Sequence, residues 1–252
     1  MIKAEAFHFI SGIQPRFMRI KSRMVLCAVL FLTIVFSANA QYKDAGIWTE
    51  GTLALEKGKR WEFTAVPELR FEENWSRLAR AFVDLGAQYK VNKRMTAGLV
   101  FRSGMANSDG FLEWRNRIQL GLGFRFKWND WSMNYAPRWQ VTLAAGGSDD
   151  ADISTNLRNR FQLKYGGVKD WDFSTSYEFF HSTGQYDFFT WQNWRWTTQA
   201  SYELNKRRAI SAGYLVQRRL LGSPQRMDFV VLVGYKYTMN LKKKEKAPPP
   251  QP

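Results

Sequence analysis

The chain has 252 residues, of which 37 are Lys or Arg and 22 are Asp or Glu, so its formal net charge is +15. This density of charge excludes a helical membrane protein. The hydrophobic share of 45%, with 11 Trp, 10 Tyr and 19 Phe, excludes a disordered basic protein, which would lack core-forming residues.

Residues 1–40 have the features of a secretory signal peptide. Residues 24–36 form a 13-residue apolar run that follows a basic segment and precedes Ala38-Asn39-Ala40, a small-x-small sequence that indicates cleavage after Ala40. The run is shorter than the roughly 20 residues of a membrane-spanning helix, which disfavours an uncleaved anchor. The first 17 residues resemble no part of such a signal, which makes Met18 an alternative start.

Removal of residues 1–40 leaves a chain without cysteine and with His181 as its one histidine. We therefore expect the exported chain to be stabilised by packing and hydrogen bonds, without disulfides. A Cys-based redox site and a multi-His metal site are excluded on the same ground, and no cofactor is expected.

Residues 44–241 repeat a unit of about 12 alternating polar and apolar residues followed by a turn, with no helical periodicity. We interpret this region as one domain, residues 41–241, made almost entirely of strands. Eleven candidate strands begin near Ile47, Trp61, Arg77 and Met95 and continue as residues 111–127, 131–143, 157–165, 171–179, 194–204, 209–220 and 227–239.

Each candidate strand has two chemically different faces. Along residues 111–127, one face carries apolar side chains such as Ile118 and Leu120, and the other carries polar ones such as Arg115 and Arg117. Because successive strand residues point to opposite sides, this alternation predicts a ribbon with one apolar and one polar face.

The connections between candidate strands alternate between short and long. Short turns are expected at residues 57–58, 91–94, 128–130, 166–170 and 205–208, longer polar loops at 105–110, 144–152, 183–187 and 221–225, and one short exception at 73–76. Short turns at one end and longer loops at the other are typical of bacterial outer-membrane barrels. We predict an all-β, antiparallel up-and-down transmembrane barrel of about 10–12 strands.

Alternation alone does not say which face lies inside. Three features favour lipid outside: the candidate strands are long enough to cross a bilayer, the polar faces carry many arginines, and Trp and Tyr cluster near the strand ends. The alternative is a soluble periplasmic barrel whose apolar face points inward and binds a lipid or another apolar ligand.

The last candidate strand ends in Gly234-Tyr235-Lys236-Tyr237-Thr238-Met239, which resembles the signal that the barrel-assembly machinery recognises. This resemblance implies that machinery, together with outer-membrane lipid, as a partner. Residues 242–252 follow as a Lys- and Pro-rich segment, which we expect to be a disordered periplasmic tail.

Several short motifs recur in order along the candidate strands: Gly46-Ile47-Trp48-Thr49, Glu68-Leu69-Arg70-Phe71 with Arg77-Leu78, Trp114-Arg115-Asn116-Arg117, and Leu157-Arg158-Asn159-Arg160 with Leu163-Lys164-Tyr165. In their order and spacing they resemble the domain-of-unknown-function 2490 family of outer-membrane barrels in Gram-negative bacteria. The resemblance covers residues 44–240 and implies an outer-membrane location, without an activity or a site.

An odd number of strands conflicts with the usual rule for single-chain barrels. Eleven strands would place Gln41 outside the cell, whereas even-numbered barrels keep both chain ends in the periplasm. We therefore expect that one segment is split, merged or folded into the lumen, and that the count is 10 or 12.

The polar faces carry the candidate functional residues, which we expect to line the lumen. The basic candidates are Arg70, Arg80, Arg102, Arg115, Arg117, Arg125, Arg138, Arg158, Arg160 and Arg195, with Lys164 and Arg219 on the same faces. The acidic candidates are Glu62, Glu68, Asp84, Glu113, Asp172, Glu178, Glu203 and Asp228.

Two interpretations of this lumen remain open. An excess of basic groups in a confined channel attracts small anionic solutes, which predicts a narrow, anion-preferring channel without covalent chemistry. Alternatively, arginine–carboxylate pairs fill a barrel of this size and leave it a structural element.

Three further functions are weighed and disfavoured. A hydrolase would need His181 as its base, but adjacent Ser182 points to the opposite face unless a bulge intervenes. Nucleic-acid binding is not expected, because the basic residues are spread over many strands. The acidic segment 146–152 is expected to be a solvated loop in preference to a cation site, so no metal site is predicted.

Overall fold

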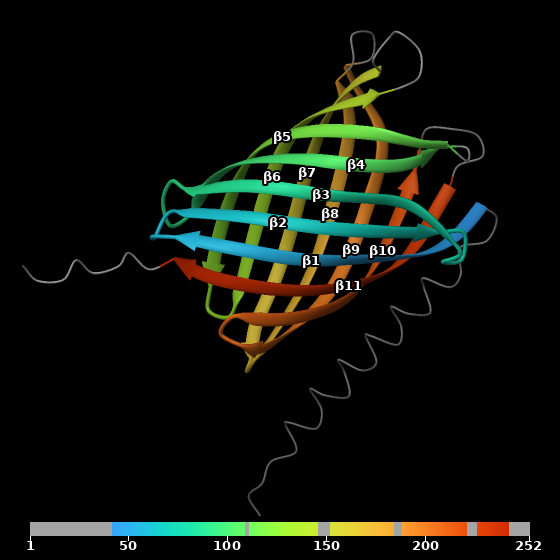
Figure 1. Ribbon diagram of the computed structural model, residues 1–252. Helices are drawn as coiled ribbons and strands as arrows, with labels where there is room; N and C mark the ends of the chain where they lie inside the picture. Colours follow the sequence, from blue (N-terminus) through green and yellow to red (C-terminus); the bar gives the residue numbers. More distant parts are fainter. Residues whose placement is uncertain (1–41, 109–110, 146–151, 184–187, 221–225, 242–252) are drawn as a thin grey trace, which may run out of the picture. The chain divides into compact units, whose positions relative to one another are not determined.

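The computed structural model of the protein describes residues 42–108, 111–145, 152–183, 188–220 and 226–241 (Figure 1). The proposed signal peptide, the tail 242–252 and the acidic loop residues 146–151 lie outside these ranges. Within the described ranges, no helix is long and apolar enough to span a membrane.

Every predicted strand segment forms a strand. The described ranges contain β1 (Tyr42–Lys57), β2 (Trp61–Glu72), β3 (Arg77–Lys90), β4 (Met95–Ser108), β5 (Phe111–Trp128), β6 (Trp131–Ala145), β7 (Asp152–Val168), β8 (Trp171–Thr183), β9 (Phe188–Asn205), β10 (Arg208–Arg219) and β11 (Arg226–Leu241). The observed strands are mostly longer than predicted. β4 in particular continues to Ser108, so the loop expected at 105–110 is largely strand.

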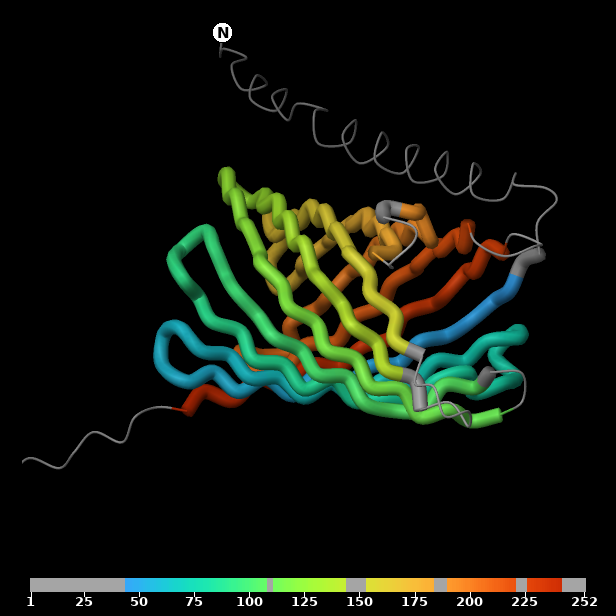
Figure 2. The backbone as a smooth tube through the Cα atoms, turned by 90° about the horizontal axis from the view of Figure 1, so that it is seen from above, coloured from blue at the N-terminus to red at the C-terminus, as the bar shows by residue number. Residues whose placement is uncertain are grey.

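The strands form one closed barrel in sequential order, with β1 beside β11 (Figures 1 and 2). All sequential neighbours pair antiparallel, whereas β1 and β11 pair in parallel from Tyr42 opposite Arg226 to Lys57 opposite Leu241. The prediction of a β-barrel is confirmed.

The expectation of 10 or 12 strands is wrong for the described chain, which has eleven. In an odd-numbered meander the first and last strands run in the same direction, so they close the barrel only as a parallel pair. That pair is continuous over all of β1, so each of the eleven described strands has a hydrogen-bonded neighbour on both edges. Strand parity alone was therefore not a sufficient reason to revise the segment count.

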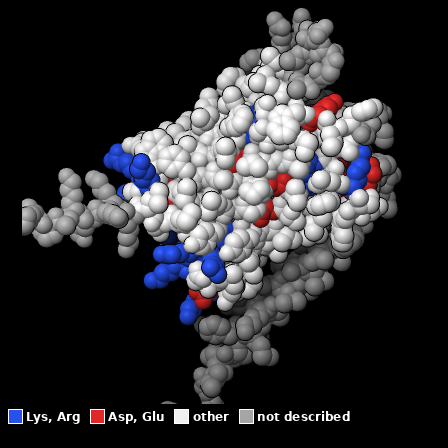
Figure 3. Space-filling model, in the orientation of Figure 1, with Lys and Arg blue, Asp and Glu red and all other residues white. Residues whose placement is uncertain are grey.

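The outer face is apolar. Leu85, Leu120, Trp139 and Trp191 illustrate it, because each exposes about half of its surface or more to the outside (53%, 50%, 48% and 52%). On the face shown in Figure 3 most of the surface is uncharged, and many Lys and Arg side chains gather toward strand ends. A surface of this kind suits contact with hydrocarbon and is unfavourable in water.

Three Trp–Tyr pairs recur at the short-turn end of the barrel. Ring centroids lie 4.9 Å apart in Trp61–Tyr89, 4.7 Å in Trp131–Tyr165 and 5.0 Å in Trp171–Tyr202. In each pair the tryptophan begins a strand and the tyrosine is its cross-strand neighbour. Such amphipathic rings at strand ends form the girdle expected at a membrane–water interface.

The inner face is polar. Gln119, Gln140 and Glu178 are 3%, 2% and 3% exposed, and Gln140 Nε2 donates to Gln119 Oε1 at 2.9 Å. This is the reverse of a soluble barrel with an apolar interior, so the alternative assignment of the two faces is wrong.

Candidate functional site: the arginine-rich lumen

The barrel encloses a cavity of about 640 Å³, and every strand contributes to its lining. Nine arginines and five carboxylates face it. The arginines are Arg70, Arg80, Arg102, Arg117, Arg138, Arg158, Arg160, Arg195 and Arg219, and the acidic residues are Glu50, Glu68, Glu72, Asp84 and Glu178.

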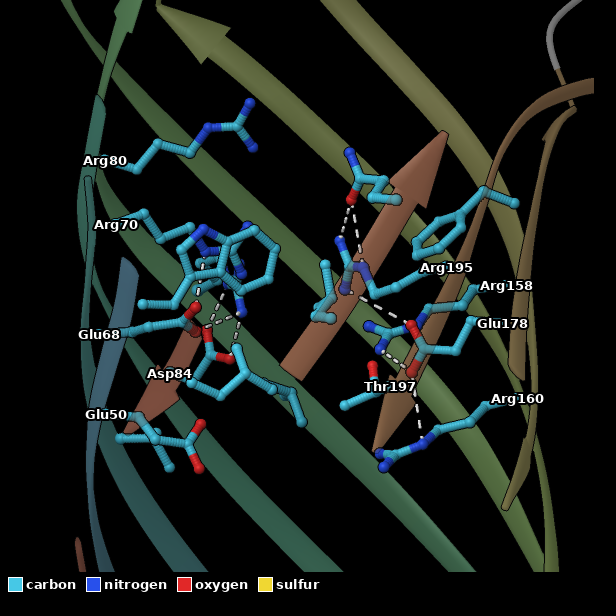
Figure 4. A pocket seen from close by; sticks show the side chains of 18 of the residues that line it. Glu50, Glu68, Arg70, Arg80, Asp84, Arg158, Arg160, Glu178, Arg195 and Thr197 are labelled. Carbon is cyan, nitrogen blue, oxygen red and sulfur yellow. Dashed lines mark hydrogen bonds and ion pairs between the residues drawn. The ribbon is translucent and has the colours of Figure 1, made fainter. Parts of the chain in front are cut away.

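One group of ion pairs lies on the wall formed by β2, β3 and β4 (Figure 4). Arg102 donates to both carboxylate oxygens of Asp84, at 2.6 and 2.7 Å, and Arg70 Nε donates to Glu68 Oε1 at 2.6 Å. Arg102 also approaches Glu68 at 3.7 Å. This β2–β4 cluster is fully paired, because each of its two arginines has a carboxylate partner.

A second group lies on the wall formed by β7, β8 and β9 (Figure 4). Glu178, 3% exposed, has its carboxylate oxygens 2.6 Å from Arg158, 3.3 Å from Arg160 and 3.5 Å from Arg195. Arg195 also donates to Gln217 Oε1 at 2.7 and 3.2 Å. This β7–β9 cluster holds three guanidinium groups around one carboxylate, which leaves it positively charged.

Three inward-facing aromatic rings pack against these clusters. The guanidinium carbon of Arg70 lies 3.7 Å from the Trp48 ring centroid, and that of Arg102 lies 3.6 Å from the Phe82 centroid. Arg158 and Arg195 both lie 5.2 Å from the ring of Phe180. Arginines held over aromatic faces lose mobility and gain cation–π energy.

A third group, the rim cluster, lies where β11 begins and β2 ends. Arg226 contacts Asp44, Glu72 at 2.9 Å and Asp228 at 2.5 Å. Arg219 joins it at 3.1 Å from Asp228 and 3.6 Å from Glu72. The cluster connects β1, β2, β10 and β11, and so it ties the parallel seam at one end of the barrel.

Asp44 also fixes the connection between β2 and β3. Its carboxylate accepts hydrogen bonds from the backbone amides of Glu73 and Asn74, at 3.1 and 3.2 Å. Glu73, Asn74 and Trp75 have positive φ angles of 55°, 54° and 70°, a conformation that costs free energy for residues with a Cβ atom. The Asp44 carboxylate therefore stabilises an otherwise unfavourable turn.

Three arginines of the cavity have no acidic partner among the described residues. No carboxylate oxygen of the described chain lies within 4 Å of Arg80, Arg117 or Arg138, although Arg117 Nε donates to Thr142 Oγ1 at 2.9 Å. We call Arg80, Arg117 and Arg138 the unpaired arginines. They are the groups that are free to meet an anion.

Most of the basic candidates from the sequence line the cavity, and two do not. Arg115 pairs with Glu113 at 2.6 Å, and Arg125 donates to Asn134 Oδ1 at 3.1 Å, both outside the cavity lining. Lys164 is exposed and also lies outside it.

The acidic candidates divide in the same way. Glu68, Asp84 and Glu178 line the cavity, and Asp228 belongs to the rim cluster. The others do not line the cavity: Glu62, Glu113, Asp172 and Glu203.

Sequence reasoning missed several lumen residues. Glu72 follows Glu68 and Arg70 at the same strand parity, so alternation was a sufficient signal for it. Glu50 shares a face with Trp48 in the same way. Alternation did not predict the three inward-facing aromatic residues, Trp48, Phe82 and Phe180. An aromatic residue on a polar face contradicts the pattern by which that face was assigned.

His181 lies away from the cavity. Its ring centroid is 5.8 Å from that of Trp191, a residue of the exposed apolar face, and neither residue lines the cavity. The register of β8 against β9 shifts between Phe180 and His181, which is the kind of bulge that a hydrolase using His181 and Ser182 would need. Among the described residues, no group of three or more His, Cys, Asp or Glu side chains is placed to hold a metal ion.

The fold and the lumen define the class: a meandering β-barrel with an apolar exterior and an arginine-rich interior. A family model described as "Protein of unknown function (DUF2490)" matches residues 45–228, so the chain belongs to this family, as its sequence motifs predicted. Among curated proteins, no match was found.

Comparison with solved structures found similarity at low sequence identity. The NanC porin has 11% identity and a TM-score of 0.48, with 78% of this chain and 99% of that chain covered. The β domain of the Bordetella autotransporter BrkA has 13% identity and a TM-score of 0.45, with coverage of 73% and 86%. An anion-selective porin from Comamonas acidovorans has 12% identity and a TM-score of 0.35, with coverage of 69% and 54%.

Proposed function

We propose that the protein is an outer-membrane channel whose narrow lumen passes small anions in preference to cations, without covalent chemistry. One observation carries this proposal: nine arginines and five carboxylates line one cavity, and three of those arginines have no carboxylate of the described residues within ion-pair distance. Fixed positive charge in a confined aqueous space raises the local concentration of anions and lowers that of cations.

The outer face supports the membrane location. An apolar surface bounded at the short-turn end by Trp–Tyr pairs matches lipid, and strands of 12 to 18 residues are long enough to cross a bilayer when tilted. In this proposal residues 1–40 direct export and are removed, the last strand engages the barrel-assembly machinery, and outer-membrane lipid surrounds the barrel.

A structural barrel without conduction is the second candidate function. The paired clusters favour it, because Arg70, Arg102, Arg158 and Arg195 are held inside the lumen by carboxylates and aromatic rings. Their side chains reduce the cross-section available to a solute. The two candidates differ in one measurable property, which is ion flow.

Planar-bilayer recording of the purified barrel tests the proposal. We expect discrete conductance steps and, across a KCl gradient, a reversal potential that indicates more chloride than potassium flow. Replacement of Arg80, Arg117 and Arg138 by Gln should shift that potential toward zero. A folded barrel that stays silent, or that passes potassium more readily than chloride, would contradict the channel proposal.

A further inference from the structure

Three arginine pairs stand directly opposite each other on neighbouring strands. In these three pairs both members line the cavity: Arg70 with Arg80, Arg102 with Arg117, and Arg138 with Arg158. A fourth opposed pair, Arg219 with Arg226, belongs to the rim cluster, where both members have carboxylate partners. Like charges at directly opposed positions of a sheet destabilise it. A single such pair needs no explanation, but three pairs around one cavity do.

In each of these three pairs, one arginine has a carboxylate partner and the other has none among the described residues. Arg70, Arg102 and Arg158 have carboxylate partners at 2.6 Å, in Glu68, Asp84 and Glu178. The opposing members of the pairs are the unpaired arginines. One guanidinium of each pair is thus fixed against a carboxylate, which Arg158 shares with Arg160 and Arg195, while the other has no carboxylate partner among the described residues.

The unpaired arginines follow a diagonal along the inner wall. Their levels can be compared along β5. Arg80 lies level with Glu113 of β5, because both are paired with Ala106 of β4. Arg138 of β6 lies directly opposite Gly121 of β5. Arg117 is itself on β5, midway between these two positions. Successive unpaired arginines are therefore two inward-facing positions apart along β5, roughly 13 Å for four residues at the usual strand rise.

We infer that the lumen binds small solutes that carry two or more oxyanion groups, carboxylate or phosphate, with Arg80, Arg117 and Arg138 as their direct ligands. This inference rests on the proposed channel, because it names the class of solute that the same lumen would take. The row favours a multivalent anion, since a solute with two oxyanion groups can engage two neighbouring members, whereas a monovalent one neutralises a single member. The cavity of about 640 Å³ admits a solute of metabolite size.

The chemistry of the side chain selects oxyanions over halides. A guanidinium presents a planar fork of donors that matches the two oxygens of a carboxylate or phosphate. The Thr142 hydroxyl restricts Arg117 by accepting from its Nε, so the terminal amino groups remain as its donors toward the lumen. The opposing arginines Arg70, Arg102 and Arg158 are held in place on the wall by their carboxylate partners.

The test is isothermal titration of the folded barrel in detergent with pyrophosphate and, separately, with citrate. Both probes should bind, and Arg80→Gln, Arg117→Gln and Arg138→Gln combined should weaken binding by about tenfold or more, because charge-assisted hydrogen bonds are lost. The matched control replaces the exposed Arg94, Arg207 and Arg208 by Gln, which changes the net charge equally. It should leave both affinities unchanged.

Arg117→Lys separates guanidinium recognition from charge. We expect it to fold and to weaken citrate binding, while the chloride preference of the channel persists. Heat-dependent migration in SDS gels verifies folding of each variant before titration. Equal affinity of Arg117→Lys and the native protein would overturn the fork argument.

The outcomes distinguish this inference from the channel proposal. Chloride-selective conductance without probe binding overturns the oxyanion site alone. Probe binding by a barrel that never conducts supports the site and overturns the channel. Equal loss of binding in the lumen triple variant and the exposed control overturns the site, since general electrostatic attraction then explains binding. Binding of pyrophosphate without citrate, or the reverse, supports the site and identifies which oxyanion it takes.

Discussion

The guanidinium carbon of Arg195 on β9 lies 5.0 Å from the ring centroid of Trp48 on β1, although β10 and β11 separate these strands around the barrel. Arg70 lies 3.7 Å from the same ring. Trp48 therefore connects the β2–β4 cluster with the β7–β9 cluster. The two charged walls meet through one aromatic side chain, which narrows the lumen at this level.

Trp48→Ala should widen the lumen. Removal of the indole leaves Arg70 and Arg195 without their shared aromatic neighbour, so we expect a larger single-channel conductance. Two cation–π contacts are lost, each worth about 0.5–2 kcal/mol, which should lower the free energy of unfolding. Recording in planar bilayers and denaturant unfolding in detergent measure the two effects.

The matched control for this variant is Trp139→Ala, which removes an indole that is 48% exposed on the outer face. It should leave the conductance unchanged. Equal conductance of the native barrel and Trp48→Ala would show that Trp48 does not define the narrow level.

Glu178→Gln should destabilise the barrel and increase its anion preference. The substitution leaves Arg158, Arg160 and Arg195 without their shared carboxylate, and loss of one partner from a buried ion pair costs about 3–5 kcal/mol. The unfolding midpoint in denaturant should fall, and the reversal potential should shift toward that of chloride.

The exposed Arg115–Glu113 pair provides the comparison for Glu178. Side chains that are 41% and 32% exposed contribute about 0–1 kcal/mol, so Glu113→Gln should change neither stability nor selectivity appreciably. If both substitutions had the same effect, the special position of Glu178 among three arginines would be disproved.

Local alternation in the sequence was enough to predict the strands and their faces. Ile118 and Leu120 face outward and Arg117 and Gln119 inward because a two-residue period is a property of each strand by itself. The contact of Arg195 with Trp48 depends on how many strands separate them around the barrel, and no local pattern contains that number. Face assignment was therefore predictable, whereas ion-pair partners across the lumen were not.

The same limit explains the error in strand parity. The rule of even strand numbers is a regularity of known barrels. The sequence of β1 shows that it is a strand, but it does not show which strand lies beside it. Parallel closure follows from where β1 lies relative to β11, which is a long-range property.

Asp44→Ala should loosen the connection between β2 and β3. The variant removes the acceptor for the amides of Glu73 and Asn74 and one carboxylate of the rim cluster. Hydrogen exchange at residues 71–78 should become faster, while exchange at the short-turn end stays unchanged. The control variant is Asp170→Ala, which changes a turn residue at the short-turn end and should leave exchange at residues 71–78 unchanged. Unchanged exchange in Asp44→Ala would mean that the turn is stable without its side-chain acceptor.

The parallel seam between β1 and β11 is open to a direct test, because residues 41–252 contain no cysteine. Ile47 and Val231 are opposite neighbours in the parallel register. Ile47→Cys with Val231→Cys should therefore form an intramolecular disulfide under mild oxidation, detected by mass spectrometry of non-reduced peptides. Ile47→Cys with Tyr235→Cys is the matched control, since Tyr235 lies four residues further along β11, beyond the reach of a disulfide. Cross-linking of the control pair, with none in the first, would place β1 in a different register, and a failure of both pairs to cross-link would contradict closure of the barrel by β1 and β11.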